Sequence, residues 1–361
     1  MVCHEQTDCS GVGVIKEGGD MGYVTIRDIA REAGVSIAAV SQILHGKGRF
    51  SDETRKAVLK TVRDMGYVPD QRARSMRSSQ TKTVGLLVPD LRNPYFADLV
   101  SSMEDELYAR GYSTLIGTSA ETVERQDAFI SNLLGQRIDG AIVVPQGVDS
   151  SGIRSLIKRD LPLVFVDRRV QGVKSVPFVV SDPYTGIRQA VEELVRLHHC
   201  RIGYVSHPSL GSFSVNERET AFRAIMSDVL PEHAGVVVEC DASYESHVSA
   251  VDVLLDAHVS AVICAYSPDA LTVIGILHDR GISIGEDISL VSFDDISAFT
   301  LMTPRIAVIS QQAGLMGRQG VALLLRRIRY GSIGDEVTHS VSTVFVNRNS
   351  VGQARVVDTS K

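Results

Sequence analysis

A short segment around residue 40 carries side chains that could read the edges of DNA base pairs. Gln42 offers a paired donor and acceptor that match N6 and N7 of adenine, and Ile37 and Ala38 can contact thymine methyl groups. Lys47 and Arg49 follow within the same segment and could neutralise phosphates. These residue types predict nucleic-acid recognition, provided that one exposed face of a helix presents them; a helical hairpin with no such function is the alternative.

The surrounding sequence predicts the helices that would position these side chains. Thr25 and Asp28 form a capping box, so a helix begins near residue 26. Gly34 ends it, because glycine tolerates the left-handed conformation just after a helix. Ser36 caps a second helix and Ser51 a third. Two short helices joined by a tight turn and braced by a third form a helix-turn-helix, whose second helix lies in the major groove.

Apolar spacing predicts which faces of these helices point inward. The inward positions are Ile26, Ile29, Ala30, Ala33, Ala39, Val40, Ile43, Leu44, Ala57, Val58, Val62 and Met65. The outer face of the second helix then presents Ile37, Ala38, Ser41 and Gln42.

The charge distribution separates this head from the rest of the chain. Residues 23–80 hold eleven Lys and Arg against six Asp and Glu, a net charge of +5, whereas residues 1–22 carry −3 and the remainder −8. A basic head on an acidic body directs the head toward a polyanion.

The composition argues against a membrane-spanning, secreted or disulfide-bonded protein. No apolar run approaches the ~18 residues of a membrane span, and residues 1–22 lack the apolar region of a secretory signal. The five cysteines show no CxxC pair, which is typical of free thiols in a reducing compartment. We therefore expect a cytoplasmic protein with no membrane contact.

Residues 82–350 alternate short apolar runs with amphipathic stretches. The expected strands are 83–88, 113–117, 140–144, 163–167, 178–182, 201–206, 236–239, 261–265 and 288–293. Helices are expected between the strands, for example over 94–110, 121–136, 184–197, 215–229 and 269–280. Repeated strand–helix–strand units imply parallel sheets covered by helices, so the fold class is α/β with an all-α head. The run is too long for one sheet, which predicts two lobes with a ligand between them.

The expected domain organisation has five parts. A disordered N-terminal extension (1–22) precedes the helix-turn-helix domain (23–66) and a hinge (67–81). A two-lobed effector-binding and dimerisation domain (82–350) and a C-terminal tail (351–361) complete the chain.

Catalytic and metal motifs are absent from the sequence. There is no Walker loop, zinc-binding HExxH or nucleophile elbow. His198 and His199 adjoin Cys200 but lack further ligands at set spacing, so we expect no metal site. No catalytic residue, cofactor or enzymatic activity is expected. A transporter's solute-binding protein and an enzyme with a two-lobed body are the competing interpretations; they would require an export signal and a catalytic set, respectively.

Long stretches of the chain resemble one family of regulators. TIRDIAREAGVSIAAVSQILHGKGRFSDETRKAVLKTVRDMGYVPDQRARSMRS, TKTVGLLVPDLRNPYFADLV and ISLVSFDDI are similar to segments of LacI/GalR (lactose-repressor-type) regulators, over nearly everything from residue 25 to about 347. The resemblance implies a periplasmic-binding-protein-like sensor and a repressor that binds double-stranded DNA at an inverted repeat. It also implies a homodimer or tetramer, controlled by a small-molecule effector such as a sugar or related metabolite.

The resemblance assigns DNA-facing positions. Ile37, Ala38 and Gln42 match operator-reading positions, and those that contact or support the DNA backbone are Thr25, Ser36, Ser41, Ser51, Thr54 and Tyr67. Departures from the family are Ala39 for threonine, Gln42 for arginine and His45 for asparagine; we keep His45 in the DNA-facing set. In the hinge, Ala73 and Met76 match family positions that contact the minor groove, and Met76 would insert between two base pairs. The alternative is that the hinge is a flexible tether with Met76 exposed.

The effector site is predicted from strand ends and from the resemblance. Tyr95 and Phe96 follow the first strand at its carboxyl end, where ligands bind in such sheets. Arg218 and Asp294 match family effector positions and could grip hydroxyl or anionic groups. Asp182 ends a strand, and further strand-end or inter-lobe candidates are Asp167 and Phe213. Core packing of Phe96 and an ion pair between Arg218 and Asp294 are the structural alternatives.

Overall fold

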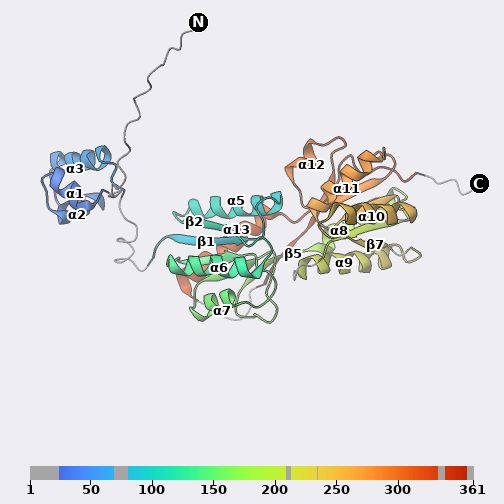
Figure 1. Cartoon of the computed structure of the whole chain (residues 1–361), viewed down its shortest axis with the longest axis horizontal. Coiled ribbons are helices and arrows are strands. Elements are labelled where there is room, and N and C mark those ends of the chain that lie inside the picture. Colours follow the sequence, from blue (N-terminus) through green and yellow to red (C-terminus); the bar gives the residue numbers. More distant parts are fainter. Residues whose placement is uncertain (1–23, 69–79, 209–212, 234, 332–337, 356–361) are drawn as a thin grey trace, which may run out of the picture. The chain divides into compact units, whose positions relative to one another are not determined.

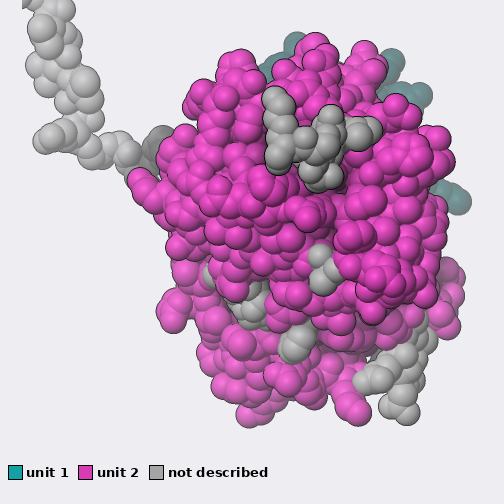
Figure 2. Space-filling model, turned by 90° about the vertical axis from the view of Figure 1, so that its right-hand side faces the viewer, with its two compact units in different colours: residues 1–79 teal, residues 80–361 magenta. Residues whose placement is uncertain are grey.

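The computed structural model describes residues 24–68, 80–208, 213–233, 235–331 and 338–355. The chain divides into two compact units, residues 1–79 and 80–361 (Figures 1 and 2). The expected N-terminal extension and the hinge positions Ala73 and Met76 lie outside the described residues. The five-part domain boundaries therefore remain predictions.

Three helices form the head: α1 (Ile26–Glu32), α2 (Ile37–Leu44) and α3 (Asp52–Asp64). The expected caps are present: the Ser36 and Ser51 hydroxyls accept from the N–H of Ala39 (3.1 Å) and Thr54 (3.2 Å). Gly34 follows α1 with φ +66°, the left-handed conformation that its position requires.

The head has its own small core. Five residues are buried together: Ile29, Ala30, Val40, Ile43 and Val58. The inward assignment of Val58 is confirmed, whereas that of Ala57 is wrong, because α3 turns Ala57 to solvent. The residues on the outer face of α2 take no part in this core.

The first lobe of the second unit is built on a six-stranded sheet in the order β11-β5-β4-β3-β1-β2. Every pair in it is parallel. Its strands are β1 (Thr83–Val88), β2 (Ser113–Thr118), β3 (Gly140–Val143), β4 (Leu163–Val166), β5 (Phe178–Asp182) and β11 (Thr338–Ser342).

The second lobe repeats this plan in the order β12-β10-β9-β8-β6-β7. Only the β10–β12 pair is antiparallel. Its strands are β6 (Ile202–Ser206), β7 (Val236–Glu239), β8 (Ala261–Cys264), β9 (Ser289–Phe293), β10 (Ala307–Ser310) and β12 (Val344–Val346).

Helices cover both faces of each sheet (Figure 1). In the first lobe α5 (Pro94–Tyr108) and α13 (Ala313–Tyr330) cover one face, and α6 (Val123–Gly135) and α7 (Ser151–Lys158) the other. Gly317 permits the close approach of α13 to α5, since a Cβ there would lie 2.9 Å from Ser102 Oγ. In the second lobe the helices are α8 (Pro183–Arg196), α9 (Phe213–Val229), α10 (Tyr244–Asp256), α11 (Ser267–Asp279) and α12 (Ser297–Leu301).

The chain passes between the lobes three times, after β5, β10 and β11. At these crossings the Thr343 hydroxyl donates to Asp182 O (2.8 Å) and accepts from Gly186 N–H (2.9 Å). Gln312 adopts φ +57° there, and its side-chain amide donates to Ser342 O (2.8 Å). The expected two-lobed α/β fold with parallel sheets is confirmed. In the described part of the chain, no helix is long and apolar enough to span a bilayer.

Candidate functional site

The outer face of α2 is exposed as the sequence predicts. Ile37 retains 46% exposure, and Ala38 and Gln42 also face solvent. Val40 and Ile43 on the opposite side are buried in the head core. The helix is therefore held by one face while the other is free to enter a groove.

Most of the expected backbone-contacting residues lie at helix termini of the head. Thr25, Ser36 and Ser51 occupy the N-cap positions of α1, α2 and α3, where the N–H groups of the first turn attract phosphate oxygens. Thr54 Oγ1 lies 2.8 Å from Ser51 Oγ, within the first turn of α3.

The remaining head residues have structural contacts as well. The ring Nδ1 of His45 lies 2.6 Å from the carbonyl oxygen of Ser41, which holds the imidazole against the last turn of α2. Tyr67 is half-buried against the head core. Both remain predicted DNA-facing residues.

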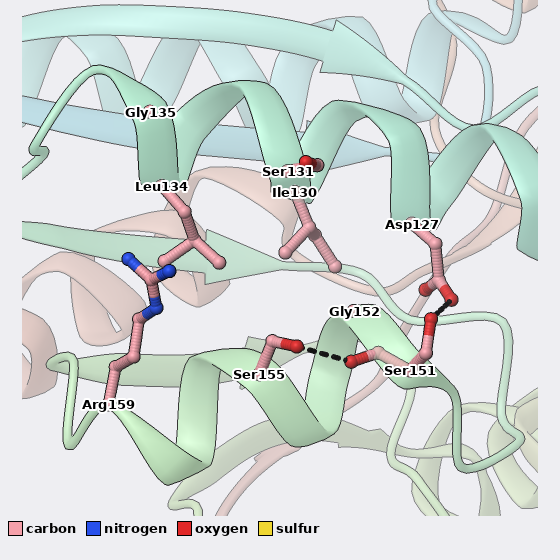
Figure 3. Close-up of a pocket in the computed structure, with 9 residues that line it drawn as sticks. All are labelled: Asp127, Ile130, Ser131, Leu134, Gly135, Ser151, Gly152, Ser155 and Arg159. Carbon is pink, nitrogen blue, oxygen red and sulfur yellow. Dashed lines mark hydrogen bonds between the residues drawn. The ribbon is translucent and has the colours of Figure 1, made fainter.

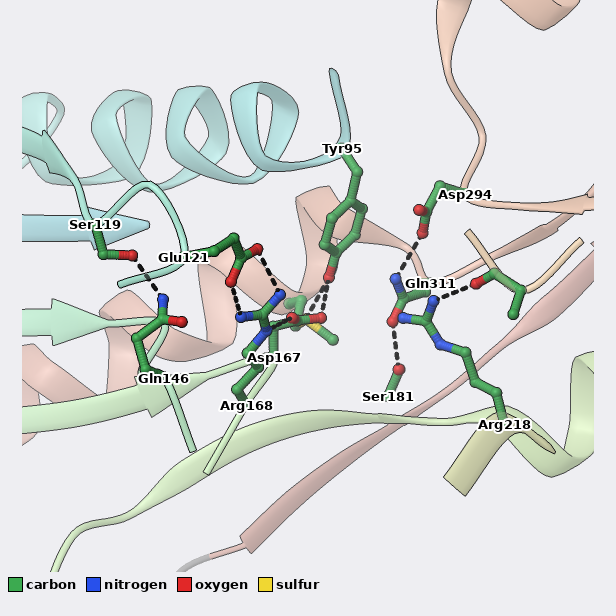
Figure 4. A network of polar contacts seen from close by, with 12 residues as sticks. Tyr95, Ser119, Glu121, Gln146, Asp167, Arg168, Ser181, Arg218, Asp294 and Gln311 are labelled. Atoms are coloured by element: carbon green, nitrogen blue, oxygen red, sulfur yellow. Dashed lines mark hydrogen bonds and ion pairs between the residues drawn. The ribbon is translucent and has the colours of Figure 1, made fainter. Parts of the chain in front are cut away.

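In the second unit, polar side chains gather at the carboxyl ends of the first lobe's strands (Figure 4). Tyr95, in the first turn of α5 after β1, donates its hydroxyl proton to Asp167 Oδ1 at 2.7 Å. Arg168 forms a bidentate pair with Glu121, at 2.7 and 3.0 Å. Gln146 donates to Ser119 Oγ at 2.6 Å. Because these strands are parallel, residues distant in sequence meet at one edge of the sheet.

The second lobe contributes Asp294, which follows β9. Its carboxylate accepts from Gln311 Nε2 (2.6 Å) and Ser267 Oγ (3.1 Å) and is 2% exposed. The Gln311 amide oxygen in turn accepts from Ser181 in the first lobe's β5 (2.6 Å). Burial raises the pKa of Asp294, while Arg218 and the bond from Gln311 oppose that shift. The network thus joins both lobes.

Asp167 and Asp294 occupy equivalent places in the two lobes. Each follows the fourth strand in chain order of its sheet, with φ +65° and +66° respectively. Non-glycine residues in this conformation are uncommon, and aspartate tolerates it better than most. Such backbone outliers cluster at ligand sites, so the repeated geometry marks these two strand ends.

Arg218 lies in the same region, as the resemblance implies. It is 5% exposed, donates to Ala265 O at 2.7 Å and stands 4.5 Å from the centre of the Phe293 ring. Its charge acts on both Tyr95 and Asp294. The structure thus brings together the three predicted residues Tyr95, Arg218 and Asp294.

Two other predicted effector residues have local structural roles. Asp182 caps α8 by accepting from Tyr184 N–H at 3.0 Å. Phe96 is 3% exposed in the core beneath α5, with the Arg168 guanidinium 5.7 Å from its ring centre. The side chain of Phe213 lies outside what the structure describes. Asp167, an additional strand-end candidate in the sequence, is by contrast a central member of the network.

A separate hollow of about 400 Å³ lies between α6 and α7 (Figure 3). Its lining comes from those two helices and the C-cap residue of α7, and it includes Asp127, Ser151 and Arg159. The Ser151 hydroxyl donates to Asp127 there, at 2.7 Å. None of the predicted effector residues lines this hollow.

His199 has a buried structural role. Its Nε2 lies 2.9 Å from Gly352 O and its Nδ1 lies 2.8 Å from Ser260 Oγ, so the ring attaches residues 351–355 to the second lobe. Burial lowers the pKa of this imidazole.

Known proteins match both parts of the chain. Residues 25–70 match the family model described as bacterial regulatory proteins, lacI family, and residues 191–351 match the periplasmic binding protein-like domain. Catabolite control protein A of Priestia megaterium is 29% identical over 317 residues, which are 87% of this chain and 95% of that protein.

Solved structures share the fold. The lac repressor dimer bound to operator and the anti-inducer ONPF aligns at a TM-score of 0.78 and 24% identity, covering 91% of this chain and 99% of that one. A LacI family transcriptional regulator from Enterococcus faecium with bound ribose aligns at 0.67 and 25% identity, covering 76% and 100%.

The fold of the head and of the two lobes, together with these family and structural matches, defines a class of protein. In this class a helix-turn-helix domain is joined to a periplasmic-binding-protein-like sensor. Within that class, the chain belongs to the LacI/GalR family of DNA-binding transcriptional regulators.

Proposed function

We propose that the chain is a repressor that binds an inverted-repeat operator as a homodimer, or as a tetramer, and that a small polar metabolite between the lobes alters its operator affinity. The exposed face of α2, with Ile37, Ala38 and Gln42 above a buried core, carries the DNA-binding part. One such head buries little surface, and two on a twofold axis would double the contacts and require a palindromic site. We further infer a cytoplasmic protein without enzymatic activity.

The effector part of the proposal rests on the inter-lobe network. Asp167, Asp294, Gln311 and Arg168 supply anionic, amide and cationic groups in a small buried volume. Sugar hydroxyls both donate and accept, so they can exchange bonds with every one of these groups, and charged partners strengthen such bonds. Tyr95 adds an aromatic ring. These features favour a sugar or a related polyhydroxyl metabolite.

An ion pair between the lobes suggests how binding and closure are linked. Arg169 follows β4, and its Nη2 lies 2.8 Å from Oε1 of Glu217 in α9; both side chains are partly exposed. An effector that stabilises the arrangement with this pair formed would shift the population of lobe arrangements by its difference in affinity for them. The coupling to operator affinity is expected to be about 1–3 kcal/mol.

Selection from random duplex DNA with the full-length chain tests the proposal. We expect enrichment of an inverted repeat with half-sites about one helical turn apart. A thermal-shift screen of mono- and disaccharides should then identify a ligand that stabilises the second unit. Enrichment of no motif over random competitor would refute the DNA-binding part. Stabilisation by no sugar, but by nucleobases, would refute the choice of effector class.

A further inference from the structure

Four chemistry-bearing residues that are scattered in the sequence meet at the carboxyl end of the second lobe's sheet. His207 follows β6, Cys240 follows β7, His247 lies in the first turn of α10, and Asp269 lies in the first turn of α11. The ligand atoms of Cys240, His247 and Asp269 all lie within 4.8 Å of one another, and the three residues are buried. We propose that Cys240, His247 and Asp269 form a binding site for a Zn²⁺-like divalent transition-metal ion.

The hydrogen bonds of His247 are the main argument. Its Nδ1 lies 2.6 Å from Ser243 O, and a carbonyl oxygen only accepts, so Nδ1 carries the ring proton. A neutral imidazole then directs the lone pair of Nε2 at Asp269 Oδ1, 3.1 Å away. Two acceptors at this distance need a proton between them, carried by the ring or by the carboxyl group, or a metal ion. Histidines that bind metals donate their other ring N–H to a backbone carbonyl in the same way.

The ligand set matches Zn²⁺ in type and charge. Cysteine, histidine and aspartate are all Zn²⁺ ligands, and a thiolate selects against hard ions such as Mg²⁺. A Cys240 thiolate and an Asp269 carboxylate balance a charge of 2+, so a buried site would carry no excess charge. Burial and the nearby Asp269 raise the pKa of the Cys240 thiol, and a bound metal ion would reverse that preference by stabilising the thiolate.

Geometry allows the site to close with small shifts. Zn–N, Zn–O and Zn–S distances of about 2.0–2.3 Å place tetrahedral ligand atoms about 3.3–3.8 Å apart, so side-chain movements of roughly 1 Å suffice. His207 Nδ1 lies 3.0 Å from the other oxygen of Asp269 and orients the carboxylate. The His207 ring also contacts Tyr266, with ring centres 4.7 Å apart and a side chain 11% exposed. The fourth tetrahedral position is then left to a water molecule.

Cobalt spectroscopy of the full-length chain tests this site. The protein for this experiment has no polyhistidine tag. It contains the replacements Cys3→Ser, Cys9→Ser and Cys200→Ser, which leave Cys240 and Cys264 as its only thiols. We expect one Co²⁺ to bind per chain and to show the intense visible absorption of tetrahedrally coordinated Co²⁺. A thiolate-to-cobalt charge-transfer band should also appear. Added Zn²⁺ should abolish this band by displacing the cobalt. Zn²⁺ should also raise the melting temperature, whereas Mg²⁺ should not. Absence of the charge-transfer band in this protein would overturn the proposal whatever the variants do.

Variants on the same background locate the site. Cys240→Ser should remove the charge-transfer band, and His247→Gln should weaken Zn²⁺ binding by more than the roughly 10–100-fold that loss of an outer partner produces. His278→Gln, an exposed histidine near the end of α11, is the matched control and should bind as the background does. A band that survives Cys240→Ser, or an equal loss in His278→Gln, would contradict the assignment.

Discussion

Replacing Ile29 by alanine should unfold the head and leave the second unit folded. Ile29 is fully buried in a head core that has five buried members among the described residues. An Ile→Ala change at such a site costs about 2–5 kcal/mol. A folding unit of about 45 residues has a total free energy of unfolding of roughly 2–7 kcal/mol. The single change therefore removes most of the head's stability.

Ile37→Ala is the matched control, since it deletes the same atoms from a side chain that is 46% exposed on α2. Its effect on stability should stay within about 0.5 kcal/mol. Hydrogen–deuterium exchange should show rapid exchange of residues 24–68 in Ile29→Ala alone, with the second unit protected as in the unmodified chain. Fluorescence anisotropy should show that Ile29→Ala has lost affinity for any duplex. Native protection and DNA affinity in Ile29→Ala would refute the reasoning.

Four further outcomes are expected. Gln42→Ala should relax base preference at one operator position by about 1–3 kcal/mol; an unchanged site profile in a repeated selection would contradict its role. Asp294→Ala or Arg218→Ala should remove the effector response and keep operator affinity, as measured by anisotropy with and without ligand; a retained response would exclude them from the site. The logarithm of operator affinity should fall linearly with the logarithm of salt concentration, by about 0.9 per phosphate neutralised, and a flat dependence would argue against phosphate contacts. Because burial lowers the pKa of His199, the unfolded chain binds its proton more readily. The free energy of unfolding should therefore fall as pH drops below about 6.5, by at most about 1.4 kcal/mol per unit from this group. His199→Gln should reduce that slope in urea titrations, and an equal slope would refute the assignment.

Features set by neighbouring residues were predictable from the sequence. The caps at Ser36 and Ser51 and the turn at Gly34 depend on contacts within one helical turn, so residue type and spacing suffice. All nine expected strands are present because each is a continuous apolar run. Three observed strands are not among the expected nine. The edge strands β11 and β12 are partly exposed, and no apolar run marks them. β10, by contrast, is a buried apolar run that the same criterion would have found.

Contacts between distant segments were not predictable in this way. Tyr95 and Asp167 are 72 positions apart, and neither residue type indicates the other as a partner. Asp182 was predicted to bind effector from its strand-end position, but the same position makes it the N-cap of the following helix. The site it would join remains a prediction.

The cluster of Cys240, His247 and Asp269 could have been found partly from the sequence. These residues lack any metal-ligand spacing, yet Cys240 directly follows a strand and the other two open the next helices. Since carboxyl ends of parallel strands share one edge of a sheet, a search restricted to residues near strand ends would have brought them together. The burial and hydrogen bonds that distinguish them require coordinates.

Reciprocal linkage between operator and effector tests the central claim most directly. Operator affinity is measured by anisotropy with and without saturating sugar, and sugar affinity by calorimetry with and without saturating operator. If one chain couples the two sites, both ratios must be equal, at about 5–150-fold. Tight binding of each ligand with no effect on the other would contradict the account.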